Sequence, residues 1–248
     1  MARIPARLTA PVLAWALLAA WPAAAIVINP SFEAGDTSGW TGSGDTGAVD
    51  ASFGITPTDG SFQALVTSGV GAASASAFES SMGLGAGFMD SLIPLISPNT
   101  DGTTVTEVSG LQQTFTAGAG DTVIFDYTFL TNEDPPEKLT SDFLFYDLSG
   151  VGSEVLASAR RRNGLSASGT AFDWESATQQ VQVVIPTAGT YTLTVGVADL
   201  EDSLRDTAGI FDAFVLLKAP EPNSFLLVAG GLIGLHAYAR HTRRRGRR

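Results

Sequence analysis

Apolar and polar residues alternate along short stretches of this chain, between turns rich in glycine, asparagine, aspartate and serine. Around residues 181–185 and 191–195 the period of two is clear, and that period is typical of a strand with one buried face. Nine short strands at this spacing predict an all-β fold, an antiparallel β-sandwich of the jelly-roll type. The candidate strands are 26–28, 62–67, 104–115, 122–130, 143–147, 154–157, 177–185, 190–200 and 210–217.

Residues 75–96 interrupt the strand pattern. This stretch is rich in alanine, serine, methionine and leucine, which predicts one or two short helices that cover an edge or an end of the sandwich. No internal repeat and no long linker divides the rest, so residues 26–218 are expected to form one β-sandwich domain.

The two ends of the chain have a different pattern. Arg3 and Arg7 precede an apolar stretch and then Ala23-Ala24-Ala25, which predicts a signal peptide over residues 1–25 that is cut before Ile26. Residues 219–248 hold an apolar run over 225–239 and six arginines after it. A spanning helix needs about 20 apolar residues, so the run predicts a marginal transmembrane helix with its arginines on the cytoplasmic side. A buried core helix followed by a basic end is the alternative.

Setting the ends aside changes the charge. The whole chain has a net charge of −11, but residues 26–219 keep only 6 Lys and Arg against 24 Asp and Glu, a formal charge of −18. Phosphates would repel such a body, so nucleic acid is not expected as a partner. Calcium, which takes oxygen ligands, suits it; an acidic surface that simply keeps the domain soluble is the alternative.

Two residue types are missing from the body. The chain has no cysteine, and its only histidines, His236 and His241, lie in the terminal segment. Their absence from the body excludes a Ser-His-Asp triad, a Cys-His pair and an ordinary zinc site there. A hydrolase that works with two carboxylates remains chemically possible, although no pair of acids stands out in the sequence.

The C-terminal segment resembles a known sorting signal. Pro220-Glu221-Pro222, the glycine-containing apolar run and the arginine-rich end are together similar to a PEP-CTERM signal. The resemblance implies recognition and removal by an exosortase-type processing enzyme. It implies export through the inner membrane, single-pass membrane association before processing, and a cell-surface or extracellular location afterwards.

The start of the body carries a second resemblance. Asn29-Pro30-Ser31-Phe32-Glu33, followed by Gly35-Asp36 and Gly39-Trp40, resembles the opening of carbohydrate-binding-module-like, galactose-binding-type jelly rolls. Such domains often close on a strand like residues 210–217, so the first and last strands are expected to be neighbours. Glu33 and Asp212 would then meet around a structural calcium, with Asp36 as a weaker third ligand; a turn hydrogen bond is the alternative for Glu33.

A third resemblance lies in the middle of the chain. Residues 125–133, an acidic proline loop and residues 141–146 are similar to exported choice-of-anchor type domains. Asn132, Glu133, Glu137 and Asp142 would place several oxygens at one end of a hairpin, where they could hold calcium. A solvated loop kept soluble by its charges is the alternative.

Few aromatic residues are left to stack on sugars. Trp40 belongs to the opening signature and is expected in the core, whereas Trp174, flanked by Asp173 and Glu175, and Tyr146 are candidates for ligand binding. The sequence therefore predicts a non-enzymatic surface or matrix protein, associated with extracellular polysaccharide and biofilm. The alternative is a carboxylate-dependent polysaccharide hydrolase.

Overall fold

The computed structural model describes residues 27–96, 102–133, 142–160, 164–200 and 205–219, together with Gly231 and His236. Its helices are α1 (Ala75–Met82) and α2 (Phe88–Ile96), and one 3-10 turn, η1, spans Ala51–Phe53. The strands are β1 (Thr41–Ser43), β2 (Asp45–Asp50), β3 (Phe62–Thr67), β4 (Ala73–Ser74), β5 (Val105–Ala117), β6 (Thr122–Thr131), β7 (Phe143–Leu148), β8 (Gly152–Ser158), β9 (Leu165–Ala167), β10 (Trp174–Ser176), β11 (Gln179–Val184), β12 (Gly189–Leu200) and β13 (Thr207–Leu217).

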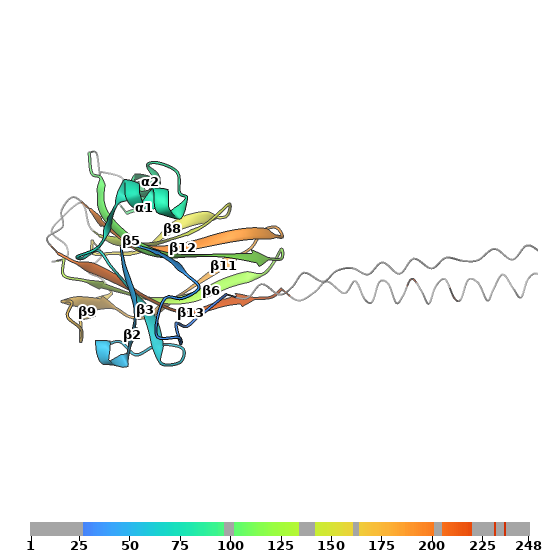
Figure 1. Cartoon of the computed structure of the whole chain (residues 1–248), viewed down its shortest axis with the longest axis horizontal. Coiled ribbons are helices and arrows are strands. Elements are labelled where there is room, and N and C mark those ends of the chain that lie inside the picture. Colours follow the sequence, from blue (N-terminus) through green and yellow to red (C-terminus); the bar gives the residue numbers. More distant parts are fainter. Residues whose placement is uncertain are drawn as a thin grey trace, which may run out of the picture.

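The strands form two stacked sheets (Figure 1). Sheet A has the order β1-β5-β12-β7-β8, and β4 also pairs with β5. Sheet B has the order β2-β3-β13-β6-β10-β9, and β11 pairs with β6. The strand pairs in both sheets are antiparallel. The predicted antiparallel sandwich is confirmed, and so are the two short helices within residues 75–96.

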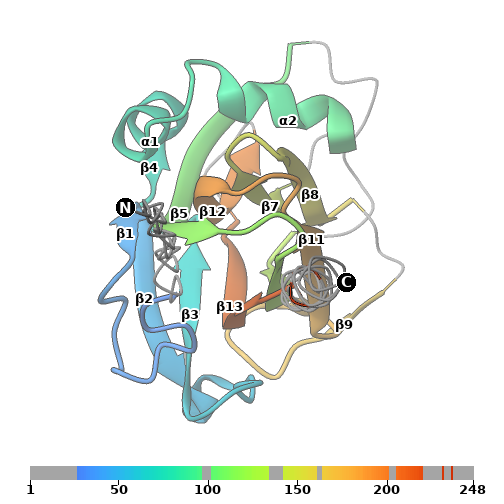
Figure 2. The same cartoon turned by 90° about the vertical axis from the view of Figure 1, so that its right-hand side faces the viewer.

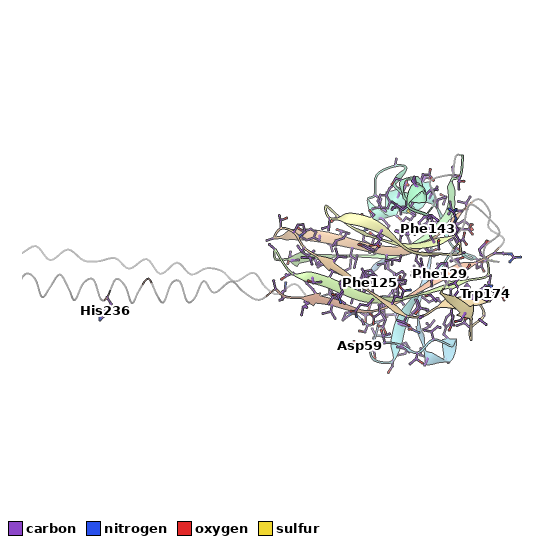
Figure 3. The ribbon with its side chains drawn as sticks, turned by 180° about the vertical axis from the view of Figure 1, so that it is seen from behind. Asp59, Phe125, Phe129, Phe143, Trp174 and His236 are labelled. Carbon is purple, nitrogen blue, oxygen red and sulfur yellow. The ribbon has the colours of Figure 1, made fainter. Side chains whose placement is uncertain are left out.

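The main core lies between the sheets. Alternate residues of β6 point into it: Val123, Phe125, Tyr127 and Phe129 are all buried, as the period of two requires. Figure 3 shows Phe125 and Phe129 within the sandwich. The ring of Phe125 stacks on Phe214, with centroids 5.1 Å apart. Full burial of each such side chain stabilises the fold by about 1.5–3 kcal/mol.

A second core covers the outer face of sheet A, where α1 and α2 pack (Figure 2). Two glycines make room for it. Gly110 of β5 and Gly196 of β12 are directly opposite each other, and the rings of Phe78 from α1 and Phe145 from β7 lie over them. These two rings meet edge to face with centroids 6.1 Å apart. The helices therefore lie closer to the sheet than side chains at these two positions would allow.

The opening segment is a folded loop and not a strand, so the predicted strand at 26–28 was wrong for residues 27 and 28. Asn29 holds the loop together: its Nδ2 donates to the carbonyls of Asp36 and Ser38, and its Oδ1 accepts from the Ala34 N–H. The loop still reaches the last strand, because the Phe214 N–H donates to the Pro30 carbonyl at 3.0 Å. Trp40 is buried there as predicted, with its ring 4.6 Å from that of Phe214.

Candidate functional site

The outer face of sheet B is the part of the sandwich that the helices leave open. One end of it is covered by η1 and its neighbouring loops, which pack on Leu130, Ala208 and Ile210. Beside this cover lies a shallow hollow in the surface, which encloses no cavity. It is lined by Thr56, Thr58, Gln63, Asp126, Tyr127, Thr128, Thr178, Ile210 and Asp212.

Most of the residues that line this hollow have polar side chains. The hydroxyls of Thr128 and Thr178 lie 2.9 Å apart, and Gln180 Nε2 donates to Asp126 Oδ1 at 3.0 Å. Such groups both donate and accept hydrogen bonds. Tyr127 offers no open ring face, since it is buried and its hydroxyl meets the Leu156 carbonyl and Gln179 Oε1.

Two carboxylates lie side by side on this face. Asp126 of β6 and Asp212 of β13 are cross-strand partners, and both line the hollow. This pair could not be recognised in the sequence, because the residues are 86 positions apart and only the strand register places them opposite each other. Two opposed carboxyl groups of this kind resemble the acid pair with which glycoside hydrolases work.

Asp212 is already bound to the protein. Its Oδ2 accepts from the Thr58 N–H at 2.8 Å, the Thr58 hydroxyl at 3.1 Å and the Asp59 N–H at 3.0 Å. Its Oδ1 accepts from the Ala213 N–H at 2.7 Å. Burial raises the pKa of Asp212, and these donors act against that rise. The carboxylate therefore fastens the Thr58–Asp59 loop to β13.

Glu33 fastens the other half of the same loop. Its Oε1 accepts from the Ser61 and Phe62 N–H groups at 2.7 and 2.8 Å. Glu33 and Asp212 therefore bind the same loop, through carboxylate oxygens that accept from N–H donors. A calcium ion needs 6–8 oxygen ligands, and both Asp212 oxygens and Glu33 Oε1 already accept hydrogen bonds from the protein, so the pair alone does not supply a calcium site. Asp36, the third candidate ligand, binds within its own turn: its Oδ1 accepts from the Ser38 N–H.

The second predicted calcium pair lies at the opposite end of the sandwich from the end of β13. Asp142 is 1% exposed; its Oδ1 accepts from the Leu200 N–H and its Oδ2 from the Thr207 hydroxyl. Burial raises the pKa of Asp142 to about 7; hydrogen bonds from Thr207 and Leu200 oppose the rise, and the charge of Glu133 adds to it. Asp199, also buried, hydrogen-bonds to the same carboxyl group. Within the described ranges, however, no group of three or more His, Cys, Asp or Glu side chains is arranged to hold a metal.

The two aromatic candidates have different surroundings. Trp174, half-buried in β10, lies at the end of the sandwich near the β9–β10 edge (Figure 3). Tyr146 faces the core: its ring meets Phe125 edge to face at 5.9 Å, and its hydroxyl donates to Glu154 Oε2 at 3.3 Å. Burial raises the pKa of Tyr146 to about 12, and the charge of Glu154 contributes. This placement leaves the Tyr146 ring out of reach of a surface ligand.

The sorting motif Pro220-Glu221-Pro222, the signal peptide and Glu137 lie outside the described residues. Among the residues that the structure does describe, no helix is long and apolar enough to cross a membrane.

Comparison with known proteins finds no matching family model and no matching curated protein. Solved structures are similar at low identity. The module TmCBM61, in complex with β-1,4-galactotriose, is 16% identical with a TM-score of 0.42, over 77% of this chain and 97% of that one. A family 16 carbohydrate-binding module is 14% identical with a TM-score of 0.38, over 77% and 99%. The xylan-binding domain CBM22-1 of Paenibacillus barcinonensis Xyn10C is 16% identical with a TM-score of 0.33, over 77% and 93%.

Proposed function

We propose that this protein is an exported, non-catalytic binding or structural protein that associates with extracellular polysaccharide at the cell surface or in the matrix. The observation that carries the proposal is the open hollow on sheet B, which is lined by hydroxyl, amide and carboxylate groups. Saccharides present hydroxyl groups that both donate and accept hydrogen bonds, so Thr178 and Asp126 match their chemistry. The solved carbohydrate-binding modules that the chain resembles agree with this role but do not carry it.

A polysaccharide hydrolase is the second candidate, and the opposed pair Asp126 and Asp212 is the observation that favours it. A catalytic acid or nucleophile has to reach the scissile bond. Asp212 is buried and accepts four hydrogen bonds from its own chain. The geometry therefore supports binding better than catalysis.

The test compares two matched substitutions. Thr178→Val removes a hydroxyl that meets Thr128 at 2.9 Å on the open face of sheet B. Thr114→Val removes one that meets Thr192 at the same distance on sheet A. Affinity electrophoresis through gels that contain extracellular polysaccharide should show weaker retardation for Thr178→Val only. Equal retardation of both variants and the parent would refute the site.

A hydrolysis screen on the same polysaccharides separates the two functions. We expect no release of reducing sugar by the parent protein. Release that disappears in Asp126→Asn, while the variant keeps its melting temperature, would make the protein a hydrolase.

Delivery to the surface is proposed from the two ends of the sequence. An exosortase-type enzyme would remove the segment after residue 219, which until then associates with the membrane. Mass spectrometry of the protein from its native cell should find neither residues 1–25 nor the arginine tail. An intact tail would make this segment a permanent anchor.

Calcium is proposed at the Glu133–Asp142 end, where Asp142 lies beside Glu133 and Asp199, although the described acids alone do not form a metal site. A negative charge on a buried carboxyl group beside two other acids is unfavourable, and either a bound proton or a bound cation neutralises it. A cation bound only by the native state raises the melting temperature. Millimolar calcium should therefore raise the melting temperature of the parent and leave that of Asp142→Asn unchanged; no shift in the parent ends the proposal.

A further inference from the structure

An exposed apolar patch lies on the outer face of sheet B where the chain leaves the sandwich. It consists of Ile124, Val184, Val215 and Leu217. The strand register places Ile124 opposite Val215, and Thr122 between Val184 and Leu217. Val184 is 61%, Val215 48% and Leu217 55% exposed. Large apolar side chains gathered in this way on a soluble domain indicate a contact surface.

The chain is fixed immediately after this patch. Lys218 Nζ and the Ala219 N–H each donate to the Asp121 carboxylate at 2.9 Å, and the Gly118 N–H donates to it at 2.7 Å. Burial pushes the pKa of Asp121 upward, but the hydrogen bonds from Lys218 and the backbone outweigh it, so the pKa is below its ordinary value. This clamp holds the exit point beside the patch.

Little chain separates the clamp from the apolar run. Residues 220–224 lie between Ala219 and the run that starts at residue 225, and five extended residues span at most about 18 Å. Once residues 225–239 enter a bilayer, the clamped end of the sandwich has to stay near the bilayer surface.

We infer that the patch of Ile124, Val184, Val215 and Leu217 rests on the lipid surface while the C-terminal segment is attached. The inference rests on the membrane association in the proposed function. The local charge is low, because Thr122 and Gln182 beside the patch are neutral, Lys218 is paired with Asp121, and Asp126, the next outward residue of β6, accepts a hydrogen bond from Gln180. The body as a whole has a charge of −18 and would be repelled by anionic lipid, so a neutral apolar end is the part of it suited to lipid contact. The contact directs the opposite end of the sandwich, with Trp174, away from the bilayer.

The chain has no cysteine, so a single introduced cysteine can be labelled with a fluorophore at that position alone. Val184→Cys and Leu217→Cys place a polarity-sensitive fluorophore on the patch. Val70→Cys is the control, since Val70 is fully exposed in the loop after β3, at the other end of the sandwich. Each full-length chain is reconstituted at low density into phosphatidylcholine vesicles with brominated acyl chains, and flotation and melting temperature are measured first.

We expect all three proteins to float with the vesicles. Emission should shift to the blue and be quenched by bromine at positions 184 and 217, with neither change at 70. Floating proteins with equal quenching at all three positions would overturn the lipid contact alone. A blue shift without bromine quenching would assign the patch to the chain's own tail or to a second copy and overturn it too. Protein that does not float would overturn the membrane association, and this inference with it.

Discussion

The opposed glycines under α1 allow a sharp test of how the helices are held. In Gly196→Ala, the added Cβ would lie 2.5 Å from the Ser109 carbonyl oxygen and 2.9 Å from Phe145 Cζ. The first contact is with the backbone of a central strand, which cannot move without disturbing its pairing. Overpacking of this kind costs about 1–3 kcal/mol. We expect Gly196→Ala to reach about 3 kcal/mol, a large share of the roughly 5–15 kcal/mol that stabilises a domain.

Urea unfolding followed by tryptophan fluorescence measures this loss. Gly47→Ala in β2 is the matched control, since no heavy atom lies within 4 Å of its added Cβ. A strand glycine with open space should be neutral or gain about 0.4–1 kcal/mol as alanine. If Gly196→Ala and Gly47→Ala unfold at the same urea concentration, the close contacts of Gly196 with Ser109 and Phe145 do not matter for stability and the packing argument fails.

Two further predictions concern buried carboxyl groups. Because the pKa of Asp142 is raised from 3.8 to about 7, the folded protein keeps a proton that the unfolded chain releases; its contribution is complete below about pH 4 and is lost as the pH rises toward about 7. Asp142→Asn should flatten this part of the stability profile in urea melts, and parallel profiles would contradict the assignment. Asp212→Ala leaves the Thr58 and Asp59 N–H groups without their acceptor and should cost about 2–4 kcal/mol, against under about 1 kcal/mol for the more exposed Asp126→Ala. Faster amide hydrogen exchange at Thr58 and Asp59 in Asp212→Ala would be the direct sign of the released loop; unchanged exchange would count against the clamp.

Much of the sandwich was predictable from the alternation of apolar and polar residues along the strands, and the exceptions have physical causes. The predicted strand at 62–67 coincides with β3, whose alternate residues Phe62, Ala64 and Val66 face the main core. β2, with the sequence Asp-Thr-Gly-Ala-Val-Asp, was missed since it is an edge strand with no apolar alternation. A strand was expected at 26–28, but residues 27 and 28 lead into a loop in which Asn29 and Phe32 have positive φ angles of 48° and 57°.

The candidate site was harder to predict, because it depends on register and on what covers each face. β7 is buried on both sides, by the main core and by the helices. Its run of aromatic residues therefore gave no sign that Tyr146 faces inward. Glu33 and Asp212 bind neighbouring parts of one loop, and whether such carboxylates bind an ion or backbone N–H groups depends on the loop between them. The opposition of Asp126 to Asp212 could be found only after β6 and β13 were paired.

The place where the chain leaves the sandwich has a mechanical consequence. β13 lies between β3 and β6 in sheet B, and its last residues continue directly into the clamp at Asp121. Tension applied at Ala219 would pull β13 along its own axis. Backbone hydrogen bonds in antiparallel pairs lie across the strands, so those on both sides of β13 would resist such a pull in shear, together. A protein tethered by this end, in flow or within a moving matrix, would carry load through one of its best-supported strands.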